Sequence, residues 1–257
     1  MPADDRATPD IQIFADAGEV ARAAALRFVE LARASINSNG RFSVALAGGS
    51  TPKRIYELLA GGEFAAQLYW PGVHVFFGDE RCVPPDHADS NYRMANEALL
   101  SRVALPAENI HRMRGEGDAV ANARLYEDEL RGFFGESEAW PEFDLVMLGM
   151  GDDGHTASLF PDTHALDARA AWVAANWVEK FDAYRLTLTA PAINHARRVM
   201  FIVTGAGKAE RLHEILHGAH DPHRLPAQLI QPRAGALAWF LDEAAAAKLN
   251  ERMRDEG

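Results

Sequence analysis

The sequence predicts an α/β fold with a mainly parallel, twisted sheet that helices cover on both faces. Short apolar runs alternate along the chain with longer segments in which apolar residues recur at helical spacing. Several of the apolar runs end in glycine-rich or charged loops, which is where open α/β sheets place their binding sites. Strands that alternate with helices form right-handed βαβ units, and such units build parallel sheets.

The first half of the chain begins with a short edge strand at residues 11–14. A helix follows over residues 17–36, because Val20, Ala24, Phe28 and Leu31 fall on one helical face. The apolar runs at 42–47, 73–77 and 143–148 predict three further strands. The segments between them predict a helix through Ile55, Leu58 and Leu59 and helices over 90–100 and 119–134.

The second half continues the alternation. Strands are expected at 172–178, 185–189, 199–204 and 237–241, and helices at 208–216 and in the alanine-rich stretch 242–253. Stretches rich in proline and glycine are short enough to be loops. We therefore expect one domain over residues 11–257, after a loose lead-in at residues 1–10.

Composition narrows the class of protein. The chain has 257 residues, 48% of them hydrophobic, and a net charge of −11. This charge argues against nucleic acid and anionic membranes as partners, since phosphate backbones attract clustered cations, but it allows a small anionic substrate. The single cysteine, Cys82, excludes an intrachain disulfide. With no signal, transit or membrane-spanning pattern, a cytoplasmic protein is expected, either a monomer or a homodimer.

The most informative stretch is FDLVMLGMGDDGHTASLFP at residues 143–161, where a buried strand breaks into a loop with three glycines. Asp153 and His155 lie two residues apart on this loop. A carboxylate can fix the tautomer of a nearby imidazole and raise its basicity, so the pair predicts a general base. A hydrogen-bonded loop histidine without catalytic role is the alternative. No further histidine or cysteine stands at ligand spacing, so no metal is expected.

The same loop also matches the dinucleotide pattern G-x-G-x-x-G at Gly149, Gly151 and Gly154. Two carboxylates within the loop would face a pyrophosphate, and Pro161 leaves no room for the long helix that this pattern requires. A nucleotide-binding fold is therefore disfavoured.

A second loop, AGGSTP at residues 47–52, joins a strand to a helix. Thr51 is expected as the N-cap and Pro52 as the first helical residue. A helix N-terminus binds anions through free N–H groups and its dipole. The groups expected to face a phosphate are the backbone N–H groups of Gly48, Gly49, Ser50 and Thr51. The alternative is an ordinary capped turn.

A third loop carries the charges Asp79, Glu80 and Arg81 on a turn at the end of a buried strand. Arg81 is the best candidate for a fork-like contact to phosphate oxygens. Asp79 or Glu80 is expected to hold Arg81 or to orient a loop backbone. Cys82 is expected to be a half-buried filler residue rather than a nucleophile.

Further cations stand nearer the C-terminus. Lys208, at a strand–loop–helix junction, is expected to supply a point charge to a phosphate. Which of Arg185, Arg197 and Arg198 joins it stays open. The role of Asn91, as a helix cap or a ligand of a sugar, stays open too.

Taken together, these segments resemble the glucosamine-6-phosphate isomerase/6-phosphogluconolactonase family, and within it the lactonases. The matching segments are LAGGSTP at 46–52, FFGDERCVP at 76–84 with SNY at 90–92, LGMGDDGHTASLFP at 148–161, RLTLTAPAIN at 185–194, FIVTGAGKAE at 201–210, and LPAQLIQP to WFLDEAA at 225–245. The resemblance implies the fold of glucosamine-6-phosphate deaminase and ribose-5-phosphate isomerase. Deaminases usually have Asn-Glu-Pro where this chain has 158–161 and lack Arg81, which favours the lactonase.

The resemblance implies hydrolysis of 6-phospho-D-glucono-1,5-lactone to 6-phospho-D-gluconate, the second step of the oxidative pentose phosphate pathway. His155 is then the base, Asp153 orients it, and Arg81, Lys208 and Arg185 join the 47–52 loop in holding the phosphate. No cofactor is implied, because lactone hydrolysis is not redox chemistry. Three alternatives stay open: a sugar-phosphate isomerase or deaminase, a non-catalytic sugar-phosphate sensor, and a dehydrogenase that binds a dinucleotide.

Overall fold

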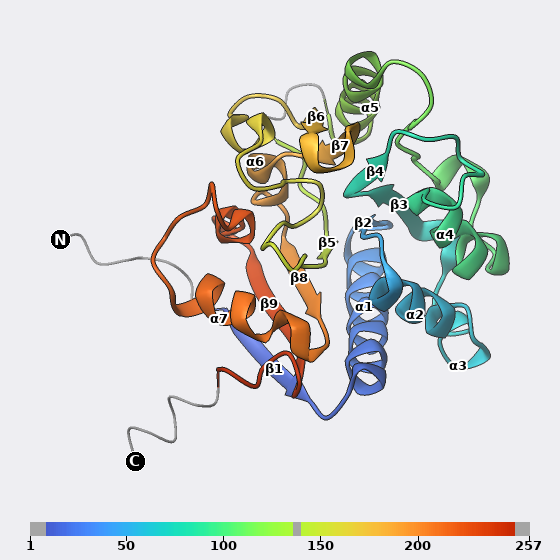
Figure 1. Cartoon of the computed structure of the whole chain (residues 1–257). Helices are drawn as coiled ribbons and strands as arrows, with labels where there is room; N and C mark the ends of the chain where they lie inside the picture. The colour runs from blue at the N-terminus through green and yellow to red at the C-terminus, as the bar shows by residue number, and fades with distance from the viewer. Residues whose placement is uncertain (1–8, 136–139, 250–257) are drawn as a thin grey trace.

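A six-stranded parallel sheet forms the centre of the computed structural model, which describes residues 9–135 and 140–249 (Figure 1). The strand order is β1-β9-β8-β5-β2-β3. The strands are β1 (Asp10–Phe14), β2 (Phe42–Leu46), β3 (Val73–Phe77), β5 (Leu145–Leu148), β8 (Arg198–Val203) and β9 (Ala236–Asp242). Every neighbouring pair is parallel, which confirms the predicted fold class.

The longer helices lie where the apolar periodicity predicts them, whereas the one-turn helices at residues 62–65 and 190–193 were not predicted. The helices are α1 (Ala17–Asn39), α2 (Ser50–Leu59), α3 (Gly62–Ala65), α4 (Asn91–Ala98), α5 (Ala119–Phe134), α6 (Ala190–Ile193) and α7 (Ala209–His217). The first of them begins at Asp16, whose carboxylate accepts the N–H groups of Gly18 and Glu19. It runs past the predicted end to Gly40, which takes a left-handed conformation at φ 75°.

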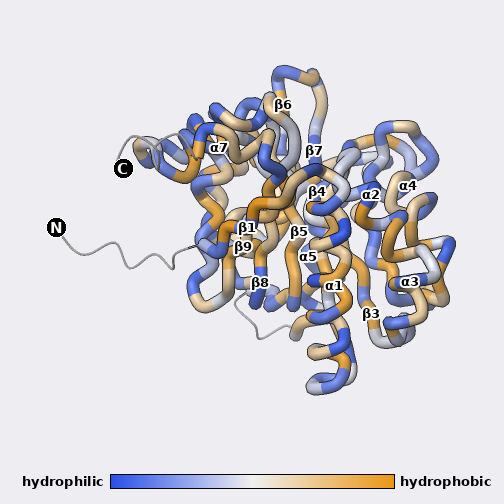
Figure 2. The backbone as a smooth tube through the Cα atoms, turned by 90° about the horizontal axis from the view of Figure 1, so that it is seen from below, coloured by the Kyte–Doolittle hydropathy of each residue, from blue (hydrophilic) through white to orange (hydrophobic). Residues whose placement is uncertain are grey.

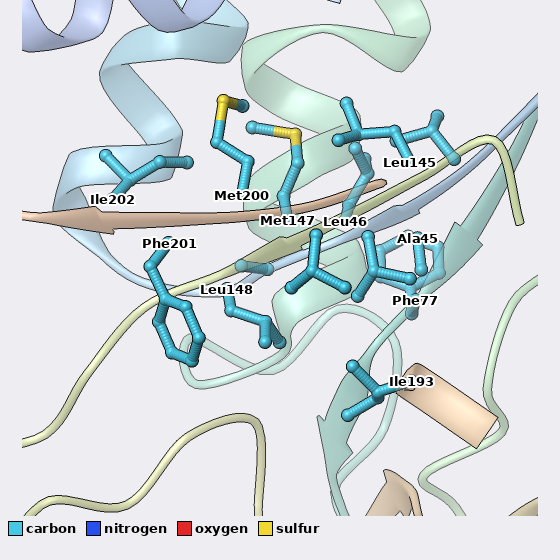
Figure 3. Packing of buried hydrophobic residues seen from close by; sticks show 14 of the residues in the cluster. Ala45, Leu46, Phe77, Leu145, Met147, Leu148, Ile193, Met200, Phe201 and Ile202 are labelled. Atoms are coloured by element: carbon cyan, nitrogen blue, oxygen red, sulfur yellow. The ribbon is translucent and has the colours of Figure 1, made fainter. Parts of the chain in front are cut away.

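The inner strands are buried on both faces, as strands of a covered parallel sheet are. All residues of β2 and β5 are buried. Met147 and Met200 point to one side of the sheet, and Leu148 and Phe201 point to the other (Figure 3). Hydrophobic colouring follows the strands of the large sheet, whereas the outer loops are mainly hydrophilic (Figure 2). This burial on both faces explains why the sequence of these strands is continuously apolar.

A second, antiparallel sheet was not predicted. It has the order β4-β7-β6, with β4 (Asp79–Arg81), β6 (Val173–Val178) and β7 (Ala183–Leu188), and lies at the top of Figure 1. The expected turn at Asp79–Arg81 is therefore wrong, because these residues pair with β7 along the register Asp79↔Thr187 to Arg81↔Arg185. Three residues are too few to show a strand period, so only the pairing partner reveals the strand.

The predicted C-terminal helix is also wrong where the structure describes it. Residues 243–249 form turns after β9. The Asp242 carboxylate accepts the N–H groups of Ala245 and Gly205, so this tail is fixed to the loop after β8. Ala245 and Ala246 are fully buried there, and tertiary packing overrides the helix propensity of alanine. Residues 250–253 of that prediction, and residues 1–8 of the lead-in, lie outside the described residues.

One buried tyrosine fixes the loop between β2 and α2. The Tyr56 hydroxyl donates to the carbonyl of Ala47 at 2.8 Å and accepts its N–H at 3.0 Å. Both partners are buried, so these backbone groups have no access to water in place of the hydroxyl.

We predict that Tyr56→Phe lowers the free energy of unfolding by about 1–3 kcal/mol, because it leaves buried polar groups of Ala47 unpaired. Urea denaturation followed by circular dichroism measures the change. Tyr69→Phe is the matched control, since Tyr69 is 65% exposed. Equal stability of the two variants would contradict this role for Tyr56.

Candidate active site

The loops that leave the carboxyl ends of the parallel strands surround one cavity of about 660 Å³. The loops after β2, β3, β5 and β8 all line it, together with residues of the small sheet. Among the predicted site residues, those that line the cavity are Gly48, Gly49, Ser50, Thr51, Arg81, His155, Arg185 and Lys208. The remaining one, Asp153, contacts His155 directly. The structure thus brings all the predicted residues together.

The predicted pair of Asp153 and His155 is formed. Nδ1 of His155 donates to Oδ1 of Asp153 at 2.5 Å, and the backbone N–H of His155 reaches the same oxygen at 3.2 Å. Gly151 permits this contact, because a Cβ there would lie 2.0 Å from Nδ1 of His155. Phe160 stacks on the imidazole with 4.1 Å between ring centroids. With Nδ1 holding the hydrogen, Nε2 of the neutral ring is left as the proton acceptor.

Asp153 is held in its charged form. Burial disfavours the carboxylate, but the hydrogen bond and charge of His155, together with Lys180, keep the pKa of Asp153 well below its usual range. The ammonium of Lys180 lies 3.3 Å from Oδ2 of Asp153. Lys180 was missed in the sequence, where it stands far from the loop it contacts. Only the pairing of β6 with β7, which puts it at a hairpin tip, could have pointed to it.

The start of α2 differs in detail from the prediction. Its N-cap is Gly49 at φ 103°, without a side-chain hydrogen bond, so Thr51 is not the cap and Pro52 is not the first helical residue. The Thr51 hydroxyl instead contacts that of Thr204 at 3.0 Å, in the loop after β8. Glycine at the cap adopts a backbone conformation that threonine would adopt only with strain. The helix still directs its N-terminus into the cavity, as predicted.

Two arginines lie side by side on the cavity wall, since Arg81 in β4 and Arg185 in β7 are register partners. Arg81 donates to the carbonyl of Asp89 at 2.5 Å, and the Arg185 guanidinium lies 5.0 Å from the ring of Phe181. Within the described ranges, no carboxylate lies within 4 Å of either guanidinium group. Burial, and then the charge of Arg81, lower the pKa of Arg185. An anion placed between the two would relieve this repulsion.

The remaining cations lie at opposite edges of the large sheet. Lys208 lies at the cavity, where its ammonium pairs with Asp152 at 2.5 Å. Arg198 opens β8, and Arg197 just before it pairs with Glu142 and Asp144, at the amino edge of the sheet. Among the arginines left open, Arg185 therefore lines the cavity and the other two do not.

The carboxylates of Asp79 and Glu80 do not pair with the guanidinium group of Arg81, and that of Glu80 binds backbone N–H groups instead. Glu80 accepts the N–H groups of Arg81, Asn91 and Tyr92 and the hydroxyl of Ser90, which is the N-cap of α4. Burial raises the pKa of Glu80, while these hydrogen bonds oppose the rise. The expectation that Asp79 or Glu80 orients a loop backbone is confirmed for Glu80.

Asp79 and Asn91 form a buried floor beneath the cavity. Oδ2 of Asp79 accepts the Ser158 hydroxyl at 2.7 Å, and Nδ2 of Asn91 donates to the carbonyl of Asp79 at 2.9 Å. A Cβ on Gly48 would lie 2.0 Å from the amide oxygen of Asn91, so only glycine fits there. Ser90 and not Asn91 is therefore the cap of this helix. Asn91 lines the cavity, and its alternative role as a ligand of a sugar stays open.

The described residues do not favour a metal ion or a dinucleotide as the ligand of this site. In residues 9–135 and 140–249, no group of three or more His, Cys, Asp or Glu side chains could hold a metal ion. The loop after Gly154 leads into a Thr156–Leu159 bridge and a short 3₁₀ turn at His164–Asp167, so the long helix of a dinucleotide site does not follow it. No helix in the described part of the chain is long and apolar enough to cross a membrane.

Known proteins share both the sequence and the fold. A family model described as "Glucosamine-6-phosphate isomerases/6-phosphogluconolactonase" matches residues 15–239. A protein of Nostoc sp. named 6-phosphogluconolactonase is 45% identical over 218 residues, which cover 84% of this chain and 88% of the relative. A 6-phosphogluconolactonase structure from Trypanosoma cruzi superposes with a TM-score of 0.84 at 30% identity, over 95% of this chain and 99% of that one.

A more distant structure bears on the fold alone. A monomeric glucosamine-6-phosphate deaminase superposes with a TM-score of 0.74 at 19% identity, over 93% of this chain and 99% of that one. The expected likeness to the deaminase fold is thereby confirmed.

We predict that Cys82 resists alkylation in the folded protein. Burial raises the pKa of its thiol to about 11, and a rise of about two units lowers the reactive thiolate fraction roughly 100-fold at pH 8. Iodoacetamide labelling followed by mass spectrometry, in buffer and in guanidinium chloride, measures both rates. A folded-state rate equal to that of the unfolded chain would contradict the burial of this thiol.

Proposed function

The chain belongs to the glucosamine-6-phosphate isomerase/6-phosphogluconolactonase family, and on this basis we propose that it hydrolyses 6-phospho-D-glucono-1,5-lactone to 6-phospho-D-gluconate, a step of the pentose phosphate pathway. The observation that carries the proposal is that one cavity holds both a candidate base and candidate groups for binding a phosphate. An imidazole held by a carboxylate shares that cavity with two guanidinium groups that lack a carboxylate partner among the described residues.

The phosphate is held at the cationic end of the cavity. Arg81 and Arg185 offer planar forks of N–H donors that match phosphate oxygens. The N-terminus of α2, at Gly49 and Ser50, adds backbone N–H groups and its dipole. Lys208 joins them when the ligand displaces Asp152 from its ammonium group. These contacts fix the far end of the substrate, so the reacting carbonyl is positioned by binding energy.

The reaction takes place at the other end. Nε2 of His155 removes a proton from water as the water oxygen bonds to C1 of the lactone. The carbonyl oxygen becomes an oxyanion, which backbone N–H groups of the glycine loops stabilise. The bond between C1 and the ring oxygen then breaks, and the ring oxygen takes the proton from His155. The product is the open-chain acid, and the imidazole returns to its neutral form.

Asp153 has two effects on this cycle. Its carboxylate fixes the tautomer with hydrogen on Nδ1, and its charge stabilises the imidazolium ion that forms when water is deprotonated. Because its pKa is held below the usual range, Asp153 stays ionised at the pH where the enzyme works. It acts through His155 and is therefore a positioning residue.

Residues 11–257 are proposed to act as one domain, since residues of both sheets contribute to one cluster of buried side chains. No step of the hydrolysis transfers electrons, so the proposal requires no redox cofactor. The remaining parts of the proposal are a cytoplasmic location and a monomer or homodimer as the active form.

We predict that His155→Gln lowers kcat by about 10²–10⁴-fold while the fold is retained, because the variant loses the general base. The assay uses freshly made 6-phosphogluconolactone, and the rate of spontaneous opening is subtracted. His220→Gln, at an exposed position, is the control. Wild-type rates no faster than the spontaneous rate would refute the lactonase and favour an isomerase, a deaminase or a sensor. Full activity in His155→Gln would refute only the assignment of the base.

We predict that Arg185→Gln raises KM for the phosphorylated lactone by about 10- to 100-fold, since a charge-assisted hydrogen bond contributes about 1.5–3 kcal/mol. The rate with unphosphorylated glucono-1,5-lactone is expected to stay near that of the wild type. Arg198→Gln is the matched control, because Arg198 is exposed at the opposite edge of the sheet. An equal loss with both lactones would show that Arg185 does not bind the phosphate.

A further inference from the structure

The hairpin between β6 and β7 reaches across to the loop that carries the catalytic pair. Its tip is a 3₁₀ turn, Glu179–Phe181, followed by Asp182 in a left-handed conformation at φ 48°. From this tip, Nζ of Lys180 lies 3.3 Å from Oδ2 of Asp153. His155 occupies the other carboxylate oxygen, Oδ1. The two oxygens of Asp153 are therefore divided between an imidazole and an ammonium group.

We propose that Lys180 is a positioning residue for the pair formed by His155 and Asp153, an inference that rests on the proposed lactonase function. A half-buried aspartate with one free oxygen can rotate about its side-chain bonds and leave the imidazole. Lys180 holds the second oxygen and so keeps Oδ1 directed at Nδ1 of His155. Its charge also offsets part of the negative charge that Asp153 places beside the ring.

Aromatic packing fixes the hairpin tip in this position. The Phe181 ring lies 5.6 Å from that of Phe160, which in turn stacks on His155 at 4.1 Å. The guanidinium group of Arg185 lies over the ring of Phe181, 5.0 Å from its centroid. The turn that presents Lys180 thus contacts Phe160, which stacks on the base, and Arg185, which we assign to the phosphate.

The other charges around the loop have different partners. Asp152 pairs with Lys208, and Nε of Arg211 donates to the backbone carbonyl of Asp152. Among the described residues, Lys180 is the one lysine or arginine within ion-pair distance of the Asp153 carboxylate. Its side chain is 65% exposed, so its effect is expected to be modest and sensitive to salt.

The test compares Lys180→Gln and Lys180→Arg, with Arg27→Gln on the exposed face of α1 as the charge-matched control. Lys180→Gln is expected to lower kcat about two- to five-fold for both the phosphorylated and the unphosphorylated lactone, with KM unchanged. Lys180→Arg is expected to restore kcat, and about 1 M salt is expected to shrink the difference from wild type.

Other results overturn the inference. A higher KM for the phosphorylated lactone alone, with kcat intact, would make Lys180 a substrate-binding residue. A kcat and a KM identical to those of the wild type would leave Lys180 without a role in the site. ¹⁵N NMR of the His155 ring separates this inference from the proposed function, since it needs no turnover. A smaller share of the Nδ1–H tautomer in Lys180→Gln supports positioning, and an unchanged share contradicts it, even if wild type fails to hydrolyse the lactone.

Discussion

The parallel direction of the six central strands is the constraint on which the site depends. Because every strand of the sheet runs the same way, the loops after β2, β3, β5 and β8 emerge at one edge. Residues far apart in the chain, such as Ser50 and His155, therefore line a single cavity. The same constraint sends Arg197 to the opposite edge, where it pairs with acids and takes no part in the site.

The small antiparallel sheet and its hairpin contribute three cationic side chains to the site. Its register puts Arg81 beside Arg185, and its hairpin carries Lys180 to the carboxylate of Asp153. Two guanidinium groups held together repel each other, and burial adds to the cost. An anion bound between the two groups would offset this repulsion. The cavity is thus lined by these two arginines, to which we assign phosphate binding, and by the imidazole of His155, to which we assign base catalysis.

Much of this arrangement is readable in the sequence, for physical reasons. Strands buried on both faces leave continuous apolar runs, and sharp loops leave glycines such as Gly151, which makes room for the imidazole. The missed features depend on contacts distant in the chain. The strand β4 forms by pairing with β7. Thr51 does not cap its helix, because its hydroxyl contacts that of Thr204. Lys180 reaches Asp153 only when the hairpin between β6 and β7 has formed. No local pattern encodes such pairings.

A crystal structure with the product, 6-phosphogluconate, bound would test this arrangement most directly. We expect the phosphate to contact the guanidinium groups of Arg81 and Arg185 and the N-terminus of α2, and the C1 carboxylate to lie against Nε2 of His155. A product bound in the reverse sense, with its phosphate at His155, would contradict the division of the cavity into a binding end and a reacting end. So would a product bound outside the cavity.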